Sequence, residues 1–463
     1  MYSRSCPGGG MPPILSARHW PRGLRPLAVA VLSLSIVSLA AAQTSSSPLT
    51  LDAALDAAQA RSATLQAQDA ATRAAREMAV SASRLPDPVL RLSVDNLPIE
   101  GPMRYSLTDD FMTMRSVSLM QTFTGSEKRQ ARAARYEREA EAATAMRSMQ
   151  KARLLAQTAG AWFDRYYQEQ MQGLLQRQRE EAGRVSEAVE SAYRGGRSSQ
   201  ADVLAAHAAV ARIDDRLHEV RAGLAAARAQ LQRWIGDGAE QALGVPPRID
   251  QTRLAEHQLG HEIDQHPDIA VMNARERVAL ADAEVARQDK SADWSWSLMY
   301  SKRGSRFGDM VSLGVSIPLQ WDQARKQDRE LSARLQKAEQ IRLEREEMRR
   351  EHLFEVQRLL ANWRGNLTRL TDYDKTLIPL ALARVQAMEA GFRGGKAPLA
   401  AVIEAQRMVT DTRLERLRIE KQTAAWWAEL EYLIPQEQAG QAPLPDPWPK
   451  TLPSPSNQPA QEQ

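Results

Sequence analysis

The sequence predicts a mainly α-helical protein with a small β part, built from two copies of one structural unit. Residues 193–204 (YRGGRSSQADVL) recur as residues 392–403 (FRGGKAPLAAVI), and each copy joins two long Ala-rich segments. Aromatic residues make up only 5% of the chain, and the strong helix formers Ala, Arg, Glu, Gln and Leu dominate it. Four short segments alternate with the period of two that marks a strand. A repeat of this length predicts a fold that was built twice.

Residues 1–42 are predicted to be a secretory signal. Four arginines precede an apolar run from Leu27 to Ala42, which is too short for a membrane-spanning helix and ends in three alanines typical of a cleavage site. Without this segment, 57 basic residues balance 57 acidic ones, so the basic pI does not indicate nucleic-acid binding. The only cysteine, Cys6, lies in the same segment. We therefore expect neither a disulfide nor a lipid-bearing cysteine in the secreted chain.

The first repeat, residues 43–235, is predicted to contain a helix, two strands and a long helical hairpin. In chain order these are a helix from Leu51 to about Arg84, strands near 88–95 and 116–123, and a hairpin from about Ser126 to Tyr193 and back to about Ile235. Prolines 86 and 88 end the first helix, because the residue before a proline disfavours helical backbone.

The second repeat, residues 266–434, is predicted to have the same order of elements after a connector at 236–265. Its elements are a helix, strands near 293–302 and 309–319, and a hairpin from about Asp322 to Phe392 and back to about Leu433. Pro379 is expected to kink or break the first arm of this hairpin. The tail, residues 435–463, is rich in Pro and Gln and is predicted to form neither helix nor strand.

The predicted strands carry apolar or aromatic residues on one face and mostly serine on the other. In WSWSLMYS, residues 294–301, Trp294, Trp296 and Tyr300 alternate with serines. This pattern is typical of a transmembrane barrel strand, with lipid outside and water inside. A strand of a soluble sandwich would alternate in the same way, but four strands are too few for a sandwich.

Four strands also cannot close a barrel alone, since small barrels take about eight. Open strand edges have no water to satisfy them in a bilayer, so we expect several copies to close one ring. The long helices would then form a tube that reaches about 100 Å from the membrane.

The turn motif carries the family resemblance. An aromatic residue is followed by Gly three positions later and by Asp-Val-Leu from the ninth, as in Tyr193, Gly196 and Asp202-Val203-Leu204. The second copy has Phe392, Gly395 and Val402-Ile403, but Ala401 replaces the aspartate. In these motifs, the repeat, the strands and the signal, the chain resembles the TolC family of outer-membrane efflux ducts over essentially its whole secreted length.

The resemblance implies a homotrimer in the bacterial outer membrane with a periplasmic extension. Each protomer would give four strands to one β-barrel and its long helical hairpins to one periplasmic tunnel. The implied partners are outer-membrane lipid, a periplasmic adaptor (membrane-fusion) protein and an inner-membrane pump of the resistance-nodulation-division or ABC type. Substrate would pass passively, and heavy-metal cations (copper, silver or divalent ions), drugs and a secreted protein all stay open.

The tip turns are the predicted docking site for the adaptor. The candidate residues, ten in the two copies of the turn, are Tyr193, Gly195, Gly196, Val203, Leu204, Phe392, Gly394, Gly395, Val402 and Ile403. The alternative is that these residues only pack each turn against the neighbouring hairpin. Asp202 and Glu404 are candidates for a cation-attracting ring at the tunnel entrance, or else are solvated or salt-bridged helix charges.

Metal binding is the other chemistry that the sequence raises. His257 and His261 would share a helix face, although solvated histidines explain them as well. Met112 and Met114, with Met103 and Met120, could offer thioethers to soft ions such as Cu(I) or Ag(I), or could simply pack.

An enzymatic function has little support in the sequence. No nucleotide-binding loop or hydrolase motif appears in it, so we expect no enzyme, no cofactor and no nucleic-acid partner. A periplasmic structural or adaptor-like coiled coil without a barrel is the alternative from another class.

Overall fold

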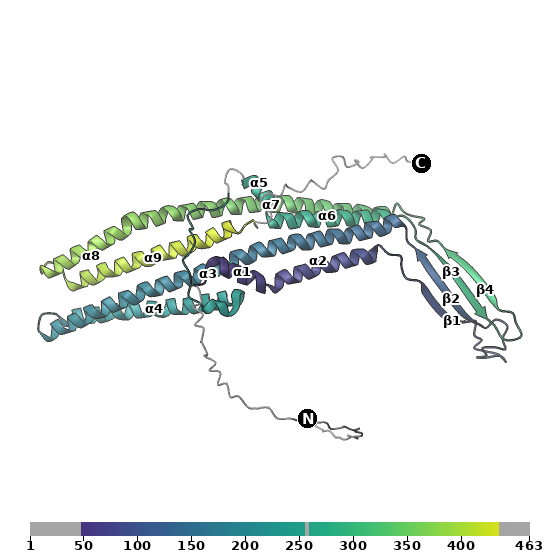
Figure 1. Cartoon of the computed structure of the whole chain (residues 1–463), viewed down its shortest axis with the longest axis horizontal. Helices are drawn as coiled ribbons and strands as arrows, with labels where there is room; N and C mark the ends of the chain where they lie inside the picture. Colours follow the sequence, from purple (N-terminus) through teal and green to yellow (C-terminus); the bar gives the residue numbers. More distant parts are fainter. Residues whose placement is uncertain (1–47, 255–258, 435–463) are drawn as a thin grey trace, which may run out of the picture. The chain divides into compact units, whose positions relative to one another are not determined.

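The computed structural model describes residues 48–254 and 259–434 and consists of long helices and one small sheet (Figure 1). The predicted fold class, mainly α with four strands, is confirmed. Among the described residues, no helix combines the length and the hydrophobicity that crossing a bilayer requires.

The predicted first helix is wrong in one respect, because it is two helices, α1 (Leu51–Arg61) and α2 (Ala63–Ala82). Ser62 between them has extended backbone, and its Oγ accepts a hydrogen bond from the backbone N–H of Leu65 at 3.3 Å. The serine therefore caps α2, as short hydroxyl side chains commonly do. The Ala-rich pattern continues across the break, which is why periodicity did not reveal it.

The four strands form a single antiparallel sheet in the order β1-β2-β3-β4. Their bounds are Val89–Asp95 for β1, Met114–Phe123 for β2, Trp294–Lys302 for β3 and Met310–Ser316 for β4. The β2–β3 pairing, which places Val117 opposite Tyr300, joins the two repeats. Within the described chain, β1 and β4 have a neighbour on one side only, so both outer edges of the sheet are open.

The strand register sorts the side chains into two faces. Cross-strand neighbours Leu92, Val117, Tyr300 and Val311 lie on one face, which we call the apolar face. It is exposed, with Leu92 at 72% and Leu313 at 80%. The opposite face, which we call the polar face, is dominated by serines, and the Oγ atoms of Ser116 and Ser301 are 2.9 Å apart across the repeat junction.

Two long helical hairpins extend from the sheet (Figure 1). The first consists of α3 (Ser126–Arg194) and α4 (Gln200–Ile235), followed by the short 3₁₀ helix η1 (Gly236–Glu240). With 69 residues, α3 is about 100 Å long at 1.5 Å per residue. The connector and the next helix contain α5 (Leu259–Asp264) and α6 (Pro267–Gln288).

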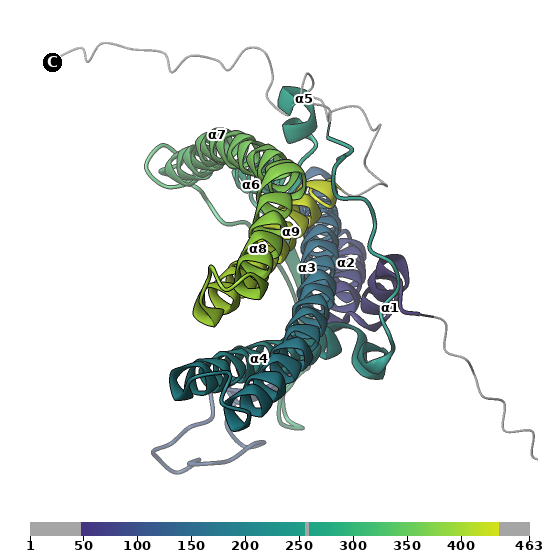
Figure 2. The ribbon, with the colours of Figure 1, turned by 90° about the vertical axis from the view of Figure 1, so that its left-hand side faces the viewer.

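The second hairpin consists of α7 (Gln327–Asp372), α8 (Ile378–Arg393) and α9 (Leu399–Glu431). A π-helical turn, Tyr373–Leu377, separates α7 from α8 directly before Pro379. The break expected at this proline is confirmed, since proline has no N–H for the helical ladder and π turns accommodate such defects. In the view along the helices in Figure 2, the two hairpins lie beside each other, and α9 packs against α3.

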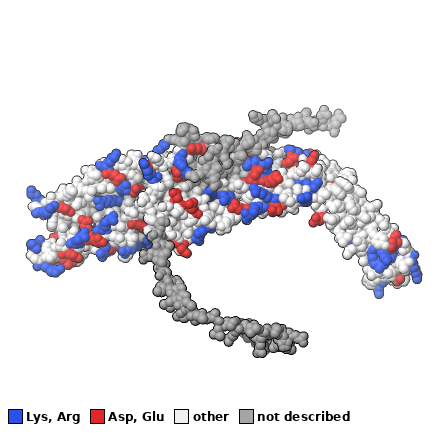
Figure 3. Space-filling view, in the orientation of Figure 1, with Lys and Arg blue, Asp and Glu red and all other residues white. Residues whose placement is uncertain are grey.

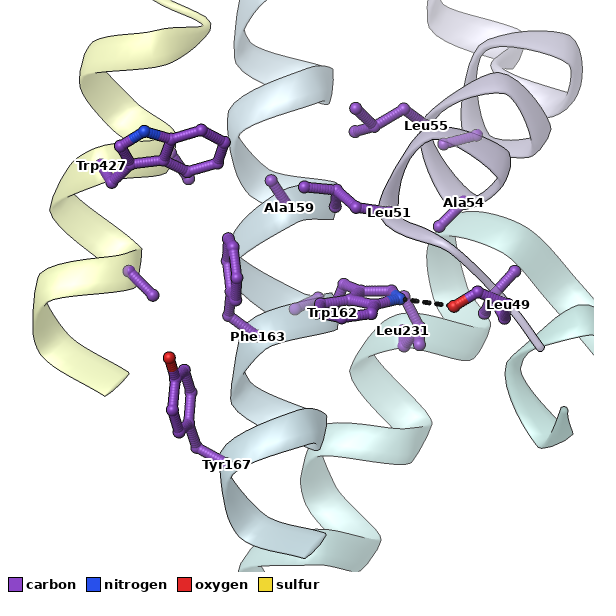
Figure 4. Close-up of a cluster of buried hydrophobic side chains, with 14 of the residues drawn as sticks. Leu49, Leu51, Ala54, Leu55, Ala159, Trp162, Phe163, Tyr167, Leu231 and Trp427 are labelled. Carbon is purple, nitrogen blue, oxygen red and sulfur yellow. Dashed lines mark hydrogen bonds between the residues drawn. The ribbon is translucent and has the colours of Figure 1, made fainter. Parts of the chain in front are cut away.

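The hydrophobic core lies around the middle of α3 (Figure 4). Trp162 is fully buried there, and its indole N–H donates to the carbonyl of Leu49 at 3.2 Å. Two further indoles, of Trp363 and Trp427, donate to the carbonyls of Ile249 (2.9 Å) and Gln251 (2.7 Å). Three tryptophans thus satisfy carbonyls of the non-helical segments before α1 and in the connector, which fastens both segments to the helices.

Candidate functional site

The two tip turns have the same backbone geometry. Gly196 and Gly395 have φ values of 72° and 69°, a left-handed conformation that glycine adopts without strain. In the first turn, the N–H of Gly196 donates to the carbonyl of Tyr193 (2.9 Å), and that of Arg197 donates to Ala192 (2.8 Å). The second turn repeats both bonds 199 residues later, at 3.0 and 2.8 Å. Both helices therefore end in a Schellman motif, and the glycines that the sequence singled out are those it requires.

The returning helices begin differently, which gives Asp202 a structural role. Ser199 and Asp202 form a capping box, in which the carboxylate accepts from the N–H (3.0 Å) and the hydroxyl (2.6 Å) of Ser199. The hydrogen bond from the serine hydroxyl lowers the pKa of Asp202. In the second repeat, Pro398 and Ala401 stand at these two positions, and no described side chain caps α9. A carboxylate at position 401 would find neither of these donors, because proline has no N–H and no hydroxyl.

Glu404, the other candidate for an entrance carboxylate, lies in a different environment. It is exposed and forms an ion pair with Arg407 at 2.9 Å. Glu404 lines a groove between the hairpins, whereas Asp202 is not part of that lining. Within the described protomer, then, each carboxylate already has a partner, and the two belong to separate surfaces.

The predicted docking residues divide into packed and exposed groups. Val203 and Ile403 pack against a small cluster near the tips, and Val402 is only 6% exposed. The cluster contains residues of both hairpins, so Val203 and Ile403 help to hold the hairpins together within one protomer. Leu204, by contrast, is 60% exposed, and the aromatic rings of Tyr193 and Phe392 are also exposed. The surface that a partner could contact therefore includes these aromatics, Leu204 and the four turn glycines, which are exposed as well.

A groove near the tips lies between α3, α4 and α9. Its apolar lining includes Val185, Ala206 and Ile403, and its charged lining includes Arg212 and Glu181. An apolar floor with a charged rim is a surface into which an amphipathic helix can pack. Sequence inspection missed this groove because residues from three separate helices form it.

The surface charge of the described structure changes along its length (Figure 3). The tip turns carry exposed cations at Arg194, Arg197, Arg393 and Lys396. On the face shown, acidic and basic residues cover the helices, and charges reappear at the far loops of the sheet. On this face, the sheet between them is almost free of charge, which is typical of a surface that contacts lipid.

The predicted histidine pair is not the cluster that the structure contains. His257 lies outside the described residues, as does the side chain of His261. Instead, His266 and His352 stack at 4.2 Å beside Asp268, and Asp268 Oδ2 is 3.3 Å from His352 Nε2. No local pattern indicated this cluster, because His352 is 84 residues beyond Asp268.

This cluster has the donor atoms of a metal site but not the arrangement. The two imidazole planes are within 28° of parallel, so their in-plane lone pairs point side by side and do not converge on one ion. His266 Nδ1 already accepts the N–H of Asp268 at 3.1 Å, and Arg153 pairs with Asp268 at 3.1 Å. Burial lowers the pKa of His266 to about 4, while the hydrogen bond to Asp268 raises the pKa of His352. The cluster therefore serves to cap the start of α6 through His266 and to pair Asp268 with Arg153.

The methionines singled out in the sequence lie in two places. Met103 and Met112 are exposed in the connection between β1 and β2. Met114 and Met120 lie on the polar face of β2, where the second repeat adds Met299 and Met310. Packing against lipid on the apolar face therefore does not explain Met114 and Met120.

Comparison with known proteins points to one class. Residues 259–434 match the family model of the outer membrane efflux protein. The outer-membrane channel OprN is 18% identical over 82% of this chain and 89% of its own, with a TM-score of 0.67. VceC, an outer membrane protein of Vibrio cholerae, is 15% identical over 83% and 95%, with a TM-score of 0.66. The outer membrane channel MtrE of Neisseria gonorrhoeae, solved in an open state, is 16% identical over 83% and 88%, also with a TM-score of 0.66. No curated protein sequence matches the chain significantly.

Proposed function

We propose that this chain is the outer-membrane duct of a tripartite efflux system. Residues 259–434 belong to the outer membrane efflux protein family, and the chain has the fold of outer-membrane channels, as its resemblance to the TolC family predicted. In this function it conducts substrate passively from the periplasm to the exterior. The energy for transport comes from an inner-membrane pump of the resistance-nodulation-division or ABC type.

The observation that carries this proposal is the sheet, which has an exposed apolar face and two open edges. In water, exposed leucines and valines at this density would cost free energy, whereas in a bilayer they contact lipid. Open edges are not tolerated in lipid, so β4 of one copy pairs with β1 of the next until a ring closes. A periplasmic coiled coil without a barrel would leave both features without a purpose.

The helices supply the periplasmic part of the duct. They continue from the same sheet for about 100 Å, and the tip turns lie at their far end (Figure 1). The adaptor docks at the tips on Tyr193, Phe392 and Leu204, which are exposed, and in the groove between α3, α4 and α9. Asp202 and Glu404 give the tunnel entrance its negative charges, although each also has the structural partner described above.

The assembly can be tested by crosslinking the open edges. In a Cys6→Ser background, Ser93→Cys on β1 and Ser312→Cys on β4 would be joined with a short bis-maleimide in outer-membrane preparations. We expect covalent dimers and trimers and no larger species, because three copies close the ring.

The matched control is the pair Ser116→Cys and Ser301→Cys, which are register partners inside one sheet. This pair should crosslink within a single chain and give only monomers. Monomers from the edge pair under conditions in which the control pair reacts would refute the ring. A ladder that continues past three chains would refute a closed trimer.

A further inference from the structure

The strand methionines are confined to one face of the sheet. Within the four described strands, the polar face carries Met114, Met120, Met299 and Met310, and the apolar face carries no methionine. If these side chains served only as flexible apolar filler, they would belong among the leucines and valines of the apolar face. Their segregation among serines therefore requires another explanation.

The register places three of these methionines next to one another. Met299 pairs directly with Ser118 on β2 and with Ser312 on β4. Met120 and Met310 lie two residues from those partners, so each is a diagonal neighbour of Met299. Diagonal neighbours have Cα atoms about 7–8 Å apart, which is within reach of long side chains. The three thioethers thus form a diagonal row across β2, β3 and β4, which we call the methionine row.

The surroundings of the methionine row are polar. Hydroxyl groups of serines flank the row, and Ser116 donates to Asp95 Oδ2 at 2.7 Å on the same face. The fourth methionine, Met114, is the register partner of Asp95. Arg91 lies on the same face as a diagonal neighbour of Met120, so its guanidinium offsets the charge of Asp95. The donor atoms, and not the net charge of the face, would therefore select the ion, and neutral thioethers select soft ions.

We propose that the polar face of the sheet binds soft monovalent metal cations, of the Ag(I) or Cu(I) type, through the methionine row. This inference rests on the proposed duct, in which the polar face lines the pore, and it names heavy-metal cations as the substrate class. Three neutral thioethers bind an ion more weakly than thiolates do. A pore that must also release its ion requires such weak, multiple sites.

The site can be tested with AgNO₃ on the trimer purified from outer membranes, in a Cys6→Ser background so that no thiol is present. The methyl groups of methionine, labelled with ¹³C, report Ag⁺ binding by NMR. We expect the methyl signals of Met120, Met299 and Met310 to shift, and Met299→Leu to weaken this binding at least tenfold. Leucine keeps the apolar volume and removes the sulfur.

The matched control is Met78→Leu, which changes an exposed methionine on α2 and should leave Ag⁺ binding unchanged. Methyl signals that do not shift, or shifts that survive Met299→Leu, would overturn the site. Conductance of the trimer in planar bilayers distinguishes this failure from failure of the duct. A conducting pore without methyl shifts overturns the site and leaves the duct standing, whereas methyl shifts without conductance support the site and overturn the duct.

Discussion

Replacing Gly196 by alanine should loosen the tip turn through backbone strain alone. Gly196 has a φ of 72°, and a Cβ built on it would meet no atom of the described chain within 4 Å. Crowding therefore cannot contribute to the effect. An L-residue in the left-handed region costs about 1–2 kcal/mol, because its Cβ approaches the following carbonyl oxygen.

The same substitution should have the opposite sign inside the helix. Gly183 lies in the interior of α3, and its added Cβ would also have open space in the described chain. Replacing a glycine by alanine at a helix-interior position stabilises the helix by up to about 1 kcal/mol. Gly183→Ala is thus a matched control that differs from Gly196→Ala only in backbone conformation.

Hydrogen exchange measured by mass spectrometry would report both changes. A destabilisation of 1–2 kcal/mol corresponds to about 5- to 30-fold faster exchange, which we expect in peptides that cover the end of α3 and the start of α4 in Gly196→Ala. Gly183→Ala should slow exchange within α3. Gly196→Asn should fall between wild type and Gly196→Ala, because asparagine tolerates the left-handed region.

The reasoning would be refuted if Gly196→Ala left exchange at the tip unchanged, or if both alanine variants shifted it in the same direction. Because Gly395 has the same φ and the same open space, Gly395→Ala should repeat the effect at the second tip. An effect at only one tip would mean that contacts with another molecule, and not backbone strain, dominate there.

Three further predictions follow from the ionisable groups. Asp202→Ala should speed hydrogen exchange at the start of α4, because it removes half of the capping box. Hydrogen bonds lower the pKa of the Asp202 carboxyl, so the stability that this carboxylate contributes is fully present above its ordinary pKa of 3.8 and is lost as the pH falls through the lower pKa of the folded state. Below that pH, wild type and variant should exchange at the same rate. In His266→Asn, the asparagine side chain can still accept the N–H of Asp268 at the start of α6, but it has no group that titrates. The unfolded chain protonates this histidine near pH 6.5, whereas the folded protein protonates it only near pH 4, so wild type loses stability as the pH is lowered from 6.5 to 4. Over this range the thermal midpoint in detergent should therefore fall less for the variant than for wild type. An equal fall in both proteins would contradict a neutral, buried histidine. Lys128→Met should lower the free energy of unfolding by about 2 kcal/mol, because it leaves Asp293 without its ion pair at 2.9 Å. The partial exposure of Asp293 limits this cost. Hydrogen exchange that stays slow between α6 and β3 would show that the ion pair is dispensable.

Much of the fold could be read from local patterns. Strand alternation depends on a period of two, and the long hairpins depend on Ala-rich helical sequence, so both are encoded within a few consecutive residues. The tip glycines were identifiable because a turn with positive φ restricts the residue type. A local signal was nevertheless missed at Ser62, since helical sequence continues on both sides of that cap.

The assignment of roles to the candidate residues depended on contacts that the sequence does not display. Asp202 had the spacing of an entrance carboxylate, and the structure shows it as half of a capping box. Val402 had the position of a docking residue and is buried within the protomer. In both cases the motif was real, but its partner residue decided its role.

Periodicity and turn chemistry, which are properties of neighbouring residues, determined by themselves that this chain has two helical hairpins and four strands with one apolar face. Only the tertiary structure decided that β2 pairs with β3, which joins methionines from both repeats into one row, and that His266 stacks on His352. These pairings unite residues 86 to about 180 positions apart, where nothing in the local sequence specifies the register. The free energy that selects them comes from burying and hydrogen-bonding whole elements against each other.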